Sequence, residues 1–258
     1  MVKFSEVAKS LHASDIREIL KVTENPEIIS FAGGLPAPEL FPIEDMKKVD
    51  VAILEKEGQQ ALQYSTTEGY VPLRKHIAER MKSAFQTECS YEDIIITAGS
   101  QQGLSLLGNI FLNKDDIVLV ESPTYMGATT AFNVKFPQTD DKGMIPEELD
   151  KIIAKYGDRI RLMYVIPDFQ NPSGITWPLE RRQAFMNIIN QHDIPVIEDD
   201  PYGELRYEGK SLPTLKSMDK KGNVIFFGSF SKILMPGLRL GWMVAAPEIL
   251  EKAVMLKQ

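Results

Sequence analysis

The stretch NVIFFGSFSKILMPGLRLGWMVAA, residues 223–246, contains two apolar runs joined by a polar, glycine-containing connection. The runs at 223–230 and 240–246 are rich in aromatic and bulky apolar residues, a composition that favours β-strands. Pro236 and Gly237 break any helix that follows Lys232 and turn the chain. The stretch therefore predicts two strands, with a single lysine and a tight turn between them.

The connection between these runs also carries a distinctive set of polar side chains. Lys232 lies among Ser229, Ser231 and Arg239. A lysine that forms a Schiff base needs an amine that can lose its proton, and burial or a nearby cation assists this loss. Hydroxyl groups and a forked guanidinium suit a phosphate dianion. An amine and a phosphate clamp this close together predict pyridoxal phosphate (PLP) as a cofactor; the alternative is a surface loop with ordinary charged residues.

Similar apolar runs alternate with helical patterns from residue 93 onward. The further runs lie at 93–99, 116–122, 131–137, 161–167 and 195–200. Helical stretches at 99–112, 146–156 and 178–192 lie between several of them. This alternation predicts an α/β fold, with a mainly parallel seven-stranded sheet covered by helices on both faces. In such sheets, ligands bind beyond the C-terminal ends of the strands.

The first part of the chain follows a different pattern. Residues 3–24 predict a helix with a break, and the glycine- and proline-rich segment 30–42 excludes a regular helix or central strand. Residues 43–57 predict another helix, and one more begins at Pro72. We divide the chain into an N-terminal arm and helix (1–45) and a PLP-binding large domain (46–258).

The composition excludes several classes of protein. The 258 residues carry a net charge of -7, which argues against nucleic acid as a main partner. No apolar run is long enough to span a membrane, and the N-terminus lacks the apolar core of a signal peptide. Cys89 is the only cysteine, which indicates a reducing cytoplasm. The three histidines share no metal-ligand spacing, so we expect no metal site.

The pattern SxSKxxxPGLRLGW resembles the cofactor-lysine signature of class I/II PLP-dependent aminotransferases, which have the aspartate aminotransferase fold. It is most similar to the branch of 2-aminoadipate and kynurenine aminotransferases, which also includes aminotransferase-like domains of some bacterial regulators. Two further strings match this branch: QNPSG at 170–174 and a D-x-x-Y pattern that begins at Asp199. The segment GSQQG at 99–103 follows the first predicted strand and predicts a helix N-terminus that could bind phosphate, or an ordinary capped helix. The resemblance runs along nearly the whole chain.

The resemblance implies a cofactor site. Lys232 would form the Schiff base, Asp199 would face the pyridine nitrogen, and Tyr202 would donate to the phenolic oxygen O3′, as would Asn171. Tyr125 would stack on the ring. The phosphate would lie at the N-terminus of the helix that begins at Ser100, where free N–H groups favour anions; its binding residues would be Ser100, Gln101, Gln102, Ser229, Ser231 and Arg239. We prefer Asp199 to Asp200 because of its spacing to Tyr202, and expect Asp200 to be a solvated neighbour.

The resemblance also implies substrate and subunit contacts. Arg17 would reach the distal carboxylate of the substrate, Gly34 would lie beside a substrate carboxylate, and Asn171 would also contact the substrate. Tyr64 would give its hydroxyl to the cofactor phosphate of a neighbouring subunit, so we expect a homodimer. The resembled enzymes continue into a small C-terminal domain that holds an arginine for the α-carboxylate, and no arginine follows Arg239 here. We therefore expect the small domain to be missing.

These features predict an aminotransferase that moves an amino group from an L-amino acid to a 2-oxo acid such as 2-oxoglutarate. The donor would be 2-aminoadipate, glutamate, or an aromatic or branched-chain amino acid. Two alternatives stay open, because the same lysine and carboxylate serve them. One is another PLP reaction, of the C–S lyase or decarboxylase type, and the other is a non-catalytic effector-binding module.

Overall fold

The computed structural model describes residues 2–4, 25, 27–29, 34–129 and 133–258. The chain divides into two compact units, Met1–Phe41 and Pro42–Gln258. In the first unit, Pro38–Leu40 form a single turn of 3-10 helix, which Pro38 begins. The helix predicted over 3–24 lies almost wholly outside the described residues. The sections that follow concern the second unit.

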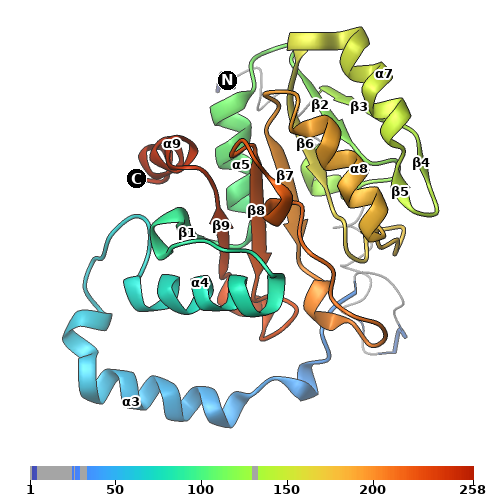
Figure 1. Ribbon diagram of the computed structural model, residues 1–258. Coiled ribbons are helices and arrows are strands. Elements are labelled where there is room, and N and C mark those ends of the chain that lie inside the picture. Colours follow the sequence, from blue (N-terminus) through green and yellow to red (C-terminus); the bar gives the residue numbers. More distant parts are fainter. Residues whose placement is uncertain (1, 5–24, 26, 30–33, 130–132) are drawn as a thin grey trace. The chain divides into compact units, whose positions relative to one another are not determined.

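A seven-stranded sheet forms the centre of the second unit, with the strand order β1-β9-β8-β7-β6-β2-β3 (Figure 1). Only β9 runs antiparallel to its neighbours, and the other pairings are parallel. The prediction of a mainly parallel seven-stranded sheet is confirmed, and each predicted run overlaps one strand. The bounds are Ile94–Thr97 (β1), Ile117–Val120 (β2), Asn133–Lys135 (β3), Ile160–Val165 (β6), Val196–Asp200 (β7), Val224–Ser229 (β8) and Gly241–Val244 (β9).

Seven α-helices lie in the described part of the chain: Ile43–Ala61 (α3), Val71–Phe85 (α4), Ser100–Phe111 (α5), Met126–Thr129 (α6), Pro146–Tyr156 (α7), Leu179–Ile189 (α8) and Pro247–Lys257 (α9). A proline in the first turn begins α4, α7 and α9, a position where its missing N–H costs no hydrogen bond. Two features were not predicted from the sequence: helix α9, and the small hairpin of β4 (Thr139–Asp140) and β5 (Gly143–Met144).

Successive side chains of a strand point to opposite faces of the sheet, and each face packs against different helices. Ile95, Phe227 and Met243 pack with α5 and α9, whereas their neighbours Phe226 and Val244 pack with α4. Helices α7 and α8 cover the same face as α4, farther along the sheet (Figure 1). Both faces are therefore covered by helices, as predicted, and the middle strands are apolar on both sides.

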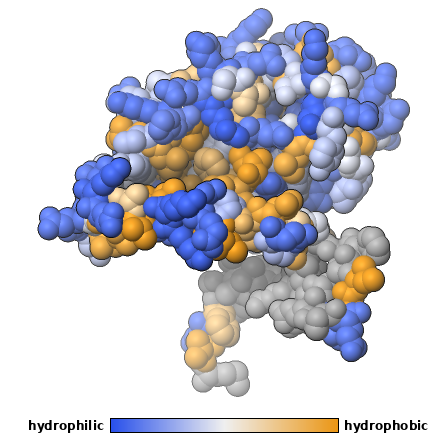
Figure 2. All heavy atoms as spheres, turned by 90° about the horizontal axis from the view of Figure 1, so that it is seen from below, coloured by the Kyte–Doolittle hydropathy of each residue, from blue (hydrophilic) through white to orange (hydrophobic). Residues whose placement is uncertain are grey.

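Helix α3 differs from the others, because none of its residues is buried. Most of its apolar side chains, among them Val49, Ile53 and Leu54, are exposed. Figure 2, seen from below, shows apolar side chains at the surface of the molecule. A long helix with exposed apolar side chains gains little of the packing that normally stabilises helices in proteins.

Candidate functional site

The predicted site residues lie at one edge of the sheet. Strands β1, β2, β6, β7 and β8 all run in one direction, so the loops that follow them leave from the same edge. Gly241 at the start of β9 pairs with Ser229 at the end of β8 and with Thr97 at the end of β1. This register brings the segments around Gly99, Ser229 and Arg239 together.

Lys232 follows β8 in a turn that its neighbours stabilise. The Ser229 hydroxyl accepts a hydrogen bond of 3.1 Å from the backbone N–H of Ser231. The Lys232 side chain is half-buried, and this burial lowers the pKa of its amine. An amine with a lowered pKa is neutral more often at a given pH, which is the property that a nucleophilic or proton-transferring lysine needs.

Arg239 lies against the beginning of helix α5. Its backbone has the left-handed conformation, with φ 49°, and its guanidinium donates to the Pro236 carbonyl at 3.4 Å. A Cβ atom on Gly99 would come within 2.8 Å of the Arg239 Nη2 atom, so the guanidinium packs directly on this glycine. Gly99 is the N-cap of α5, whose first N–H groups carry a partial positive charge. The site therefore combines a guanidinium with a helix N-terminus, an arrangement that suits a phosphate.

The glutamines at the start of α5 have different surroundings. Gln102 turns back and accepts a hydrogen bond of 2.8 Å from the backbone N–H of Ala98. This bond stabilises the helix start, because it pairs a backbone donor next to the first turn. Gln101 is exposed and donates to the Gly127 carbonyl at 3.5 Å. The phosphate contacts predicted for Ser100, Gln101 and Gln102 stay predictions.

Asp199, at the end of β7, is only 4% exposed. Its Oδ2 atom accepts a hydrogen bond of 2.7 Å from the Tyr164 hydroxyl, and its Oδ1 atom is buried without a hydrogen-bond partner among the described residues. Burial raises the pKa of Asp199 to about 6, against the opposing effects of the Tyr164 and Ser100 side chains. Ser100 forms no well-aligned hydrogen bond with Oδ1. A buried, unpartnered acceptor of this kind is costly unless a ligand satisfies it.

Three further predicted residues lie in the loops around Asp199. Asn171 Nδ2 donates to the Tyr202 hydroxyl at 3.4 Å, so the loops after β6 and β7 meet here. Tyr125, in the loop after β2, is half-buried; burial raises its pKa, the charge of Asp199 raises it further, and Arg239 lowers it. The structure thus brings Tyr125, Asn171 and Tyr202 to the edge of the sheet where Asp199 lies.

The loop that carries Asn171 is held by residues that sequence reasoning missed. Asp168 pairs with Arg182 at 2.7 Å and with Arg206 at 2.6 Å. The Arg206 guanidinium also stacks over the Phe169 ring, 4.7 Å from its centre. Because Arg206 closely follows Tyr202, this network ties the Asn171 loop to the Tyr202 segment. The available signal was an acidic residue between an apolar run and the QNPSG string, but its two arginine partners lie too far away in sequence to be recognised.

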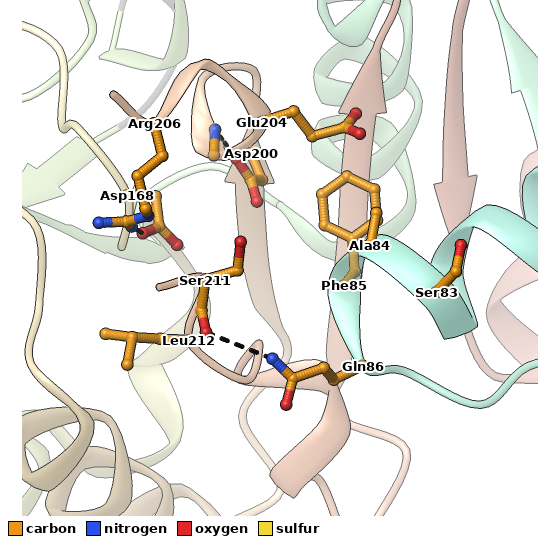
Figure 3. A pocket seen from close by; sticks show the side chains of 11 residues that line it. Ser83, Ala84, Phe85, Gln86, Asp168, Asp200, Glu204, Arg206, Ser211 and Leu212 are labelled. Atoms are coloured by element: carbon orange, nitrogen blue, oxygen red, sulfur yellow. Dashed lines mark hydrogen bonds and ion pairs between the residues drawn. The ribbon is translucent and has the colours of Figure 1, made fainter. Parts of the chain in front are cut away.

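Asp200 corrects an expectation from the sequence. It is only 8% exposed, so the interpretation as a solvated neighbour was wrong. Successive strand residues point to opposite faces, and Asp200 therefore leaves β7 on the side away from Asp199. It lines a pocket of about 300 Å³ between the end of α4 and the segment 203–212 (Figure 3). Its Oδ1 atom accepts from the Gly203 N–H at 2.6 Å.

The remaining predicted residues are not part of this cluster. Arg17 lies outside the described residues. Gly34 belongs to the first unit and has a left-handed backbone, with φ 50°, so its relation to the strand ends stays a prediction. Tyr64 follows α3 and is 98% exposed.

We also searched the described residues for metal sites and for membrane-spanning helices. Within them, no three His, Cys, Asp or Glu side chains group in a way that could hold a metal ion. None of the helices described is both long enough and apolar enough to span a membrane.

Comparison with known proteins identifies the family of this chain. A model of the family "aminotransferase class I and II" matches residues 35–258. An aromatic-amino-acid aminotransferase of Thermococcus litoralis is 45% identical over 99% of this chain and 63% of its own length. A 2-aminoadipate transaminase of Thermus thermophilus is 43% identical over 99% of this chain and 64% of its own.

A solved structure is similar over the same extent. The kynurenine aminotransferase of Pyrococcus horikoshii, crystallised in complex with PMP, superposes with a TM-score of 0.91 and 44% identity. The match covers 99% of this chain and 65% of that protein. This chain therefore spans less than two thirds of the length of these relatives.

Proposed function

We propose that this chain, which belongs to the class I and II aminotransferase family, binds PLP and acts in the transfer of amino groups between L-amino acids and 2-oxo acids. One observation carries this proposal: the buried Oδ1 atom of Asp199, which has no hydrogen-bond partner in the described part of the chain. A carboxylate oxygen in this state fits a protonated ring nitrogen, which would supply both a proton and a compensating positive charge.

The surrounding residues fit the rest of such a cofactor. Arg239, Gly99 and the N-terminus of α5 would hold the phosphate, and Tyr125 would lie on the ring. The Asn171–Tyr202 pair would bind the phenolic oxygen. When bound, PLP supplies an electron sink for the electron pair left on the substrate's Cα.

The chain's own residues would control the proton. Lys232 would hold the cofactor and then, as a free amine, take the proton from the substrate's Cα, since burial lowers its pKa and favours the neutral base. Asp199 would stay ionised beside the ring nitrogen. Tyr202, held by Asn171, would keep the phenolic oxygen hydrogen-bonded.

The donor amino acid is part of the proposal. The relatives act, by their names, on aromatic amino acids, 2-aminoadipate and kynurenine. We expect the same range here, with 2-oxoglutarate as the acceptor. Arg17 and Gly34 are the residues we expect to contact the substrate's carboxylates.

A homodimer and a cytoplasmic location complete the proposal. Tyr64 is almost fully exposed, and it follows a helix with no buried residue. Both observations support a second subunit that covers α3 and receives the Tyr64 hydroxyl at its own phosphate site. The single free cysteine, Cys89, supports a reducing compartment.

The test is a visible absorption spectrum of the chain with added PLP, followed by borohydride reduction and peptide mapping. We expect a yellow complex with the adduct on Lys232, lost in Lys232→Ala and retained in the matched control Lys210→Ala, whose lysine is exposed. Adducts spread over many lysines would contradict the proposed site.

The reaction class needs a second measurement. After addition of kynurenine, 2-aminoadipate or glutamate, we expect a 2-oxo acid and the amine form of the cofactor. Release of ammonia or carbon dioxide instead would favour the lyase or decarboxylase alternative.

A further inference from the structure

Tyr164 is a polar residue in the interior of the sheet that the proposed function does not yet use. It lies in β6 and is 1% exposed. It pairs with Ile197 of β7, so its side chain is on the same face as Asp199, two residues farther along. A long side chain reaches such a diagonal neighbour, and its hydroxyl donates to Asp199 Oδ2 at 2.7 Å.

Because of this contact, the two carboxylate oxygens of Asp199 have different surroundings. Oδ2 has a strong donor, whereas Oδ1 has no partner among the described residues. A hydrogen bond from the fixed Tyr164 hydroxyl orients the carboxylate group, so that one oxygen is held toward Tyr164 and the other is directed away from it. The geometry points to Tyr164 as a positioning residue, which holds Asp199 so that Oδ1 is the oxygen presented to the cofactor's ring nitrogen.

The electrostatics of the pair support this inference, which rests on the proposed function. Burial and the charge of Asp199 raise the pKa of Tyr164 well above 10, so its hydroxyl stays protonated and acts as a donor throughout the working pH range. Its hydrogen bond lowers the pKa of Asp199 against the opposing effect of burial. The charges of Tyr125 and Glu121 raise the pKa of Tyr164 further.

The first test is the titration of Asp199 in the cofactor-free chain. Aspartate labelled with ¹³C at the carboxyl carbon reports each pKa by NMR, and Asp199→Asn identifies the signal. In Tyr164→Phe, we expect the pKa of Asp199 to rise by about one to two pH units, since a charge-assisted hydrogen bond is lost. Tyr156→Phe, in α7 on the other face of the sheet, is the control and should leave it unchanged. An unchanged pKa in Tyr164→Phe would overturn the inference.

The second test separates positioning from a general packing effect. Tyr164→Phe should weaken binding of PLP about tenfold, and should leave unchanged the binding of an analogue in which carbon replaces the ring nitrogen. In the Asp199→Asn background, Tyr164→Phe should have no further effect on PLP. Equal weakening for both ligands would assign Tyr164 a merely structural role and overturn the inference.

The two proposals fail in different ways. If the wild-type chain binds neither ligand, the proposed function is wrong, and the titration alone still decides whether Tyr164 controls Asp199. If PLP binds at Lys232 but Tyr164→Phe changes neither the titration nor the affinity, only the inference about Tyr164 is wrong.

Discussion

Asp199 and Asp200 are consecutive residues of β7, and their carboxyl groups lie on opposite faces of the sheet in different electrostatic surroundings. Asp199 receives a hydrogen bond from Tyr164, and its pKa is about 6. Among the described residues, Asp200 accepts a hydrogen bond from the Gly203 N–H; it lies near the charge of Asp168 and has a pKa of about 8. Burial is the largest cause of both shifts, and the hydroxyl donor accounts for part of the difference between them.

Asp200 should reduce the stability of the folded chain as the pH rises. Its pKa is 3.8 without the fold and about 8 within it, so the unfolded chain releases its proton first. Folding therefore becomes less favourable between pH 4 and pH 8. Asp200→Asn removes this cost, and we expect urea unfolding at pH 8 to show a gain of at least about 1.4 kcal/mol. The gain should be absent at pH 4.

Asp140 is a control, because its pKa is shifted in the opposite direction from that of Asp200. Its salt bridge with Arg181, at 2.9 Å, lowers its pKa, so it stabilises the fold above the ordinary pKa and loses this effect as the pH falls. Asp140→Asn should slightly reduce stability at pH 8, because the pair is partly exposed. A gain for Asp140→Asn equal to that for Asp200→Asn would mean that overall negative charge, rather than burial, causes the effect.

The ion pairs around Asp168 should differ in energy from those at the surface. The Arg182 side chain is fully buried, and Asp168→Ala would leave it and Arg206 without their carboxylate. We expect a loss of about 3–5 kcal/mol in the free energy of unfolding. Arg80→Ala breaks the more exposed pair with Glu204 and should cost no more than about 1 kcal/mol. Similar costs for the two variants would contradict this ranking.

Much of this fold could be predicted from the sequence, because both faces of the sheet are buried. Each strand then reads as a continuous apolar run, and the polar residues that follow the runs mark the strand ends. The hairpin of β4 and β5 was not predicted, because each of its strands has only two residues. Helix α9 was not predicted, because it follows the last apolar run and no further strand came after it to indicate a helix between two strands.

The sequence allowed us to predict the candidate site residues at the strand ends, but not the residues that pack around them. Asp199 lies in the last residues of an apolar strand, and Asn171 and Lys232 follow strand ends; a polar residue is conspicuous at both places. Tyr164 lies inside an apolar run, where a tyrosine is read as packing. The face on which Asp200 lies depends on strand register, and its burial depends on α4 and the loop after β7 packing around it. These are long-range contacts that spacing within one segment does not reveal.

Gly99 should prove essential for the position of Arg239. Its φ of 77° is unfavourable for any other residue, and a Cβ atom would lie 2.8 Å from the Arg239 Nη2 atom. Gly209 is the matched control, because its φ is 78° and no described atom lies within 4 Å of the same Cβ position. Gly209→Ala should cost only the backbone strain, about 1–2 kcal/mol by chemical denaturation.

Gly99→Ala should add a second effect to the backbone strain. The displaced guanidinium no longer lies at the N-terminus of α5, so binding of inorganic phosphate, measured by calorimetry, should weaken at least about tenfold. Gly209→Ala should leave phosphate binding unchanged. If Gly99→Ala binds phosphate as well as wild type, the helix N-terminus binds the anion without Arg239. Equal weakening in both variants would mean that lost stability, rather than the displaced arginine, reduces binding.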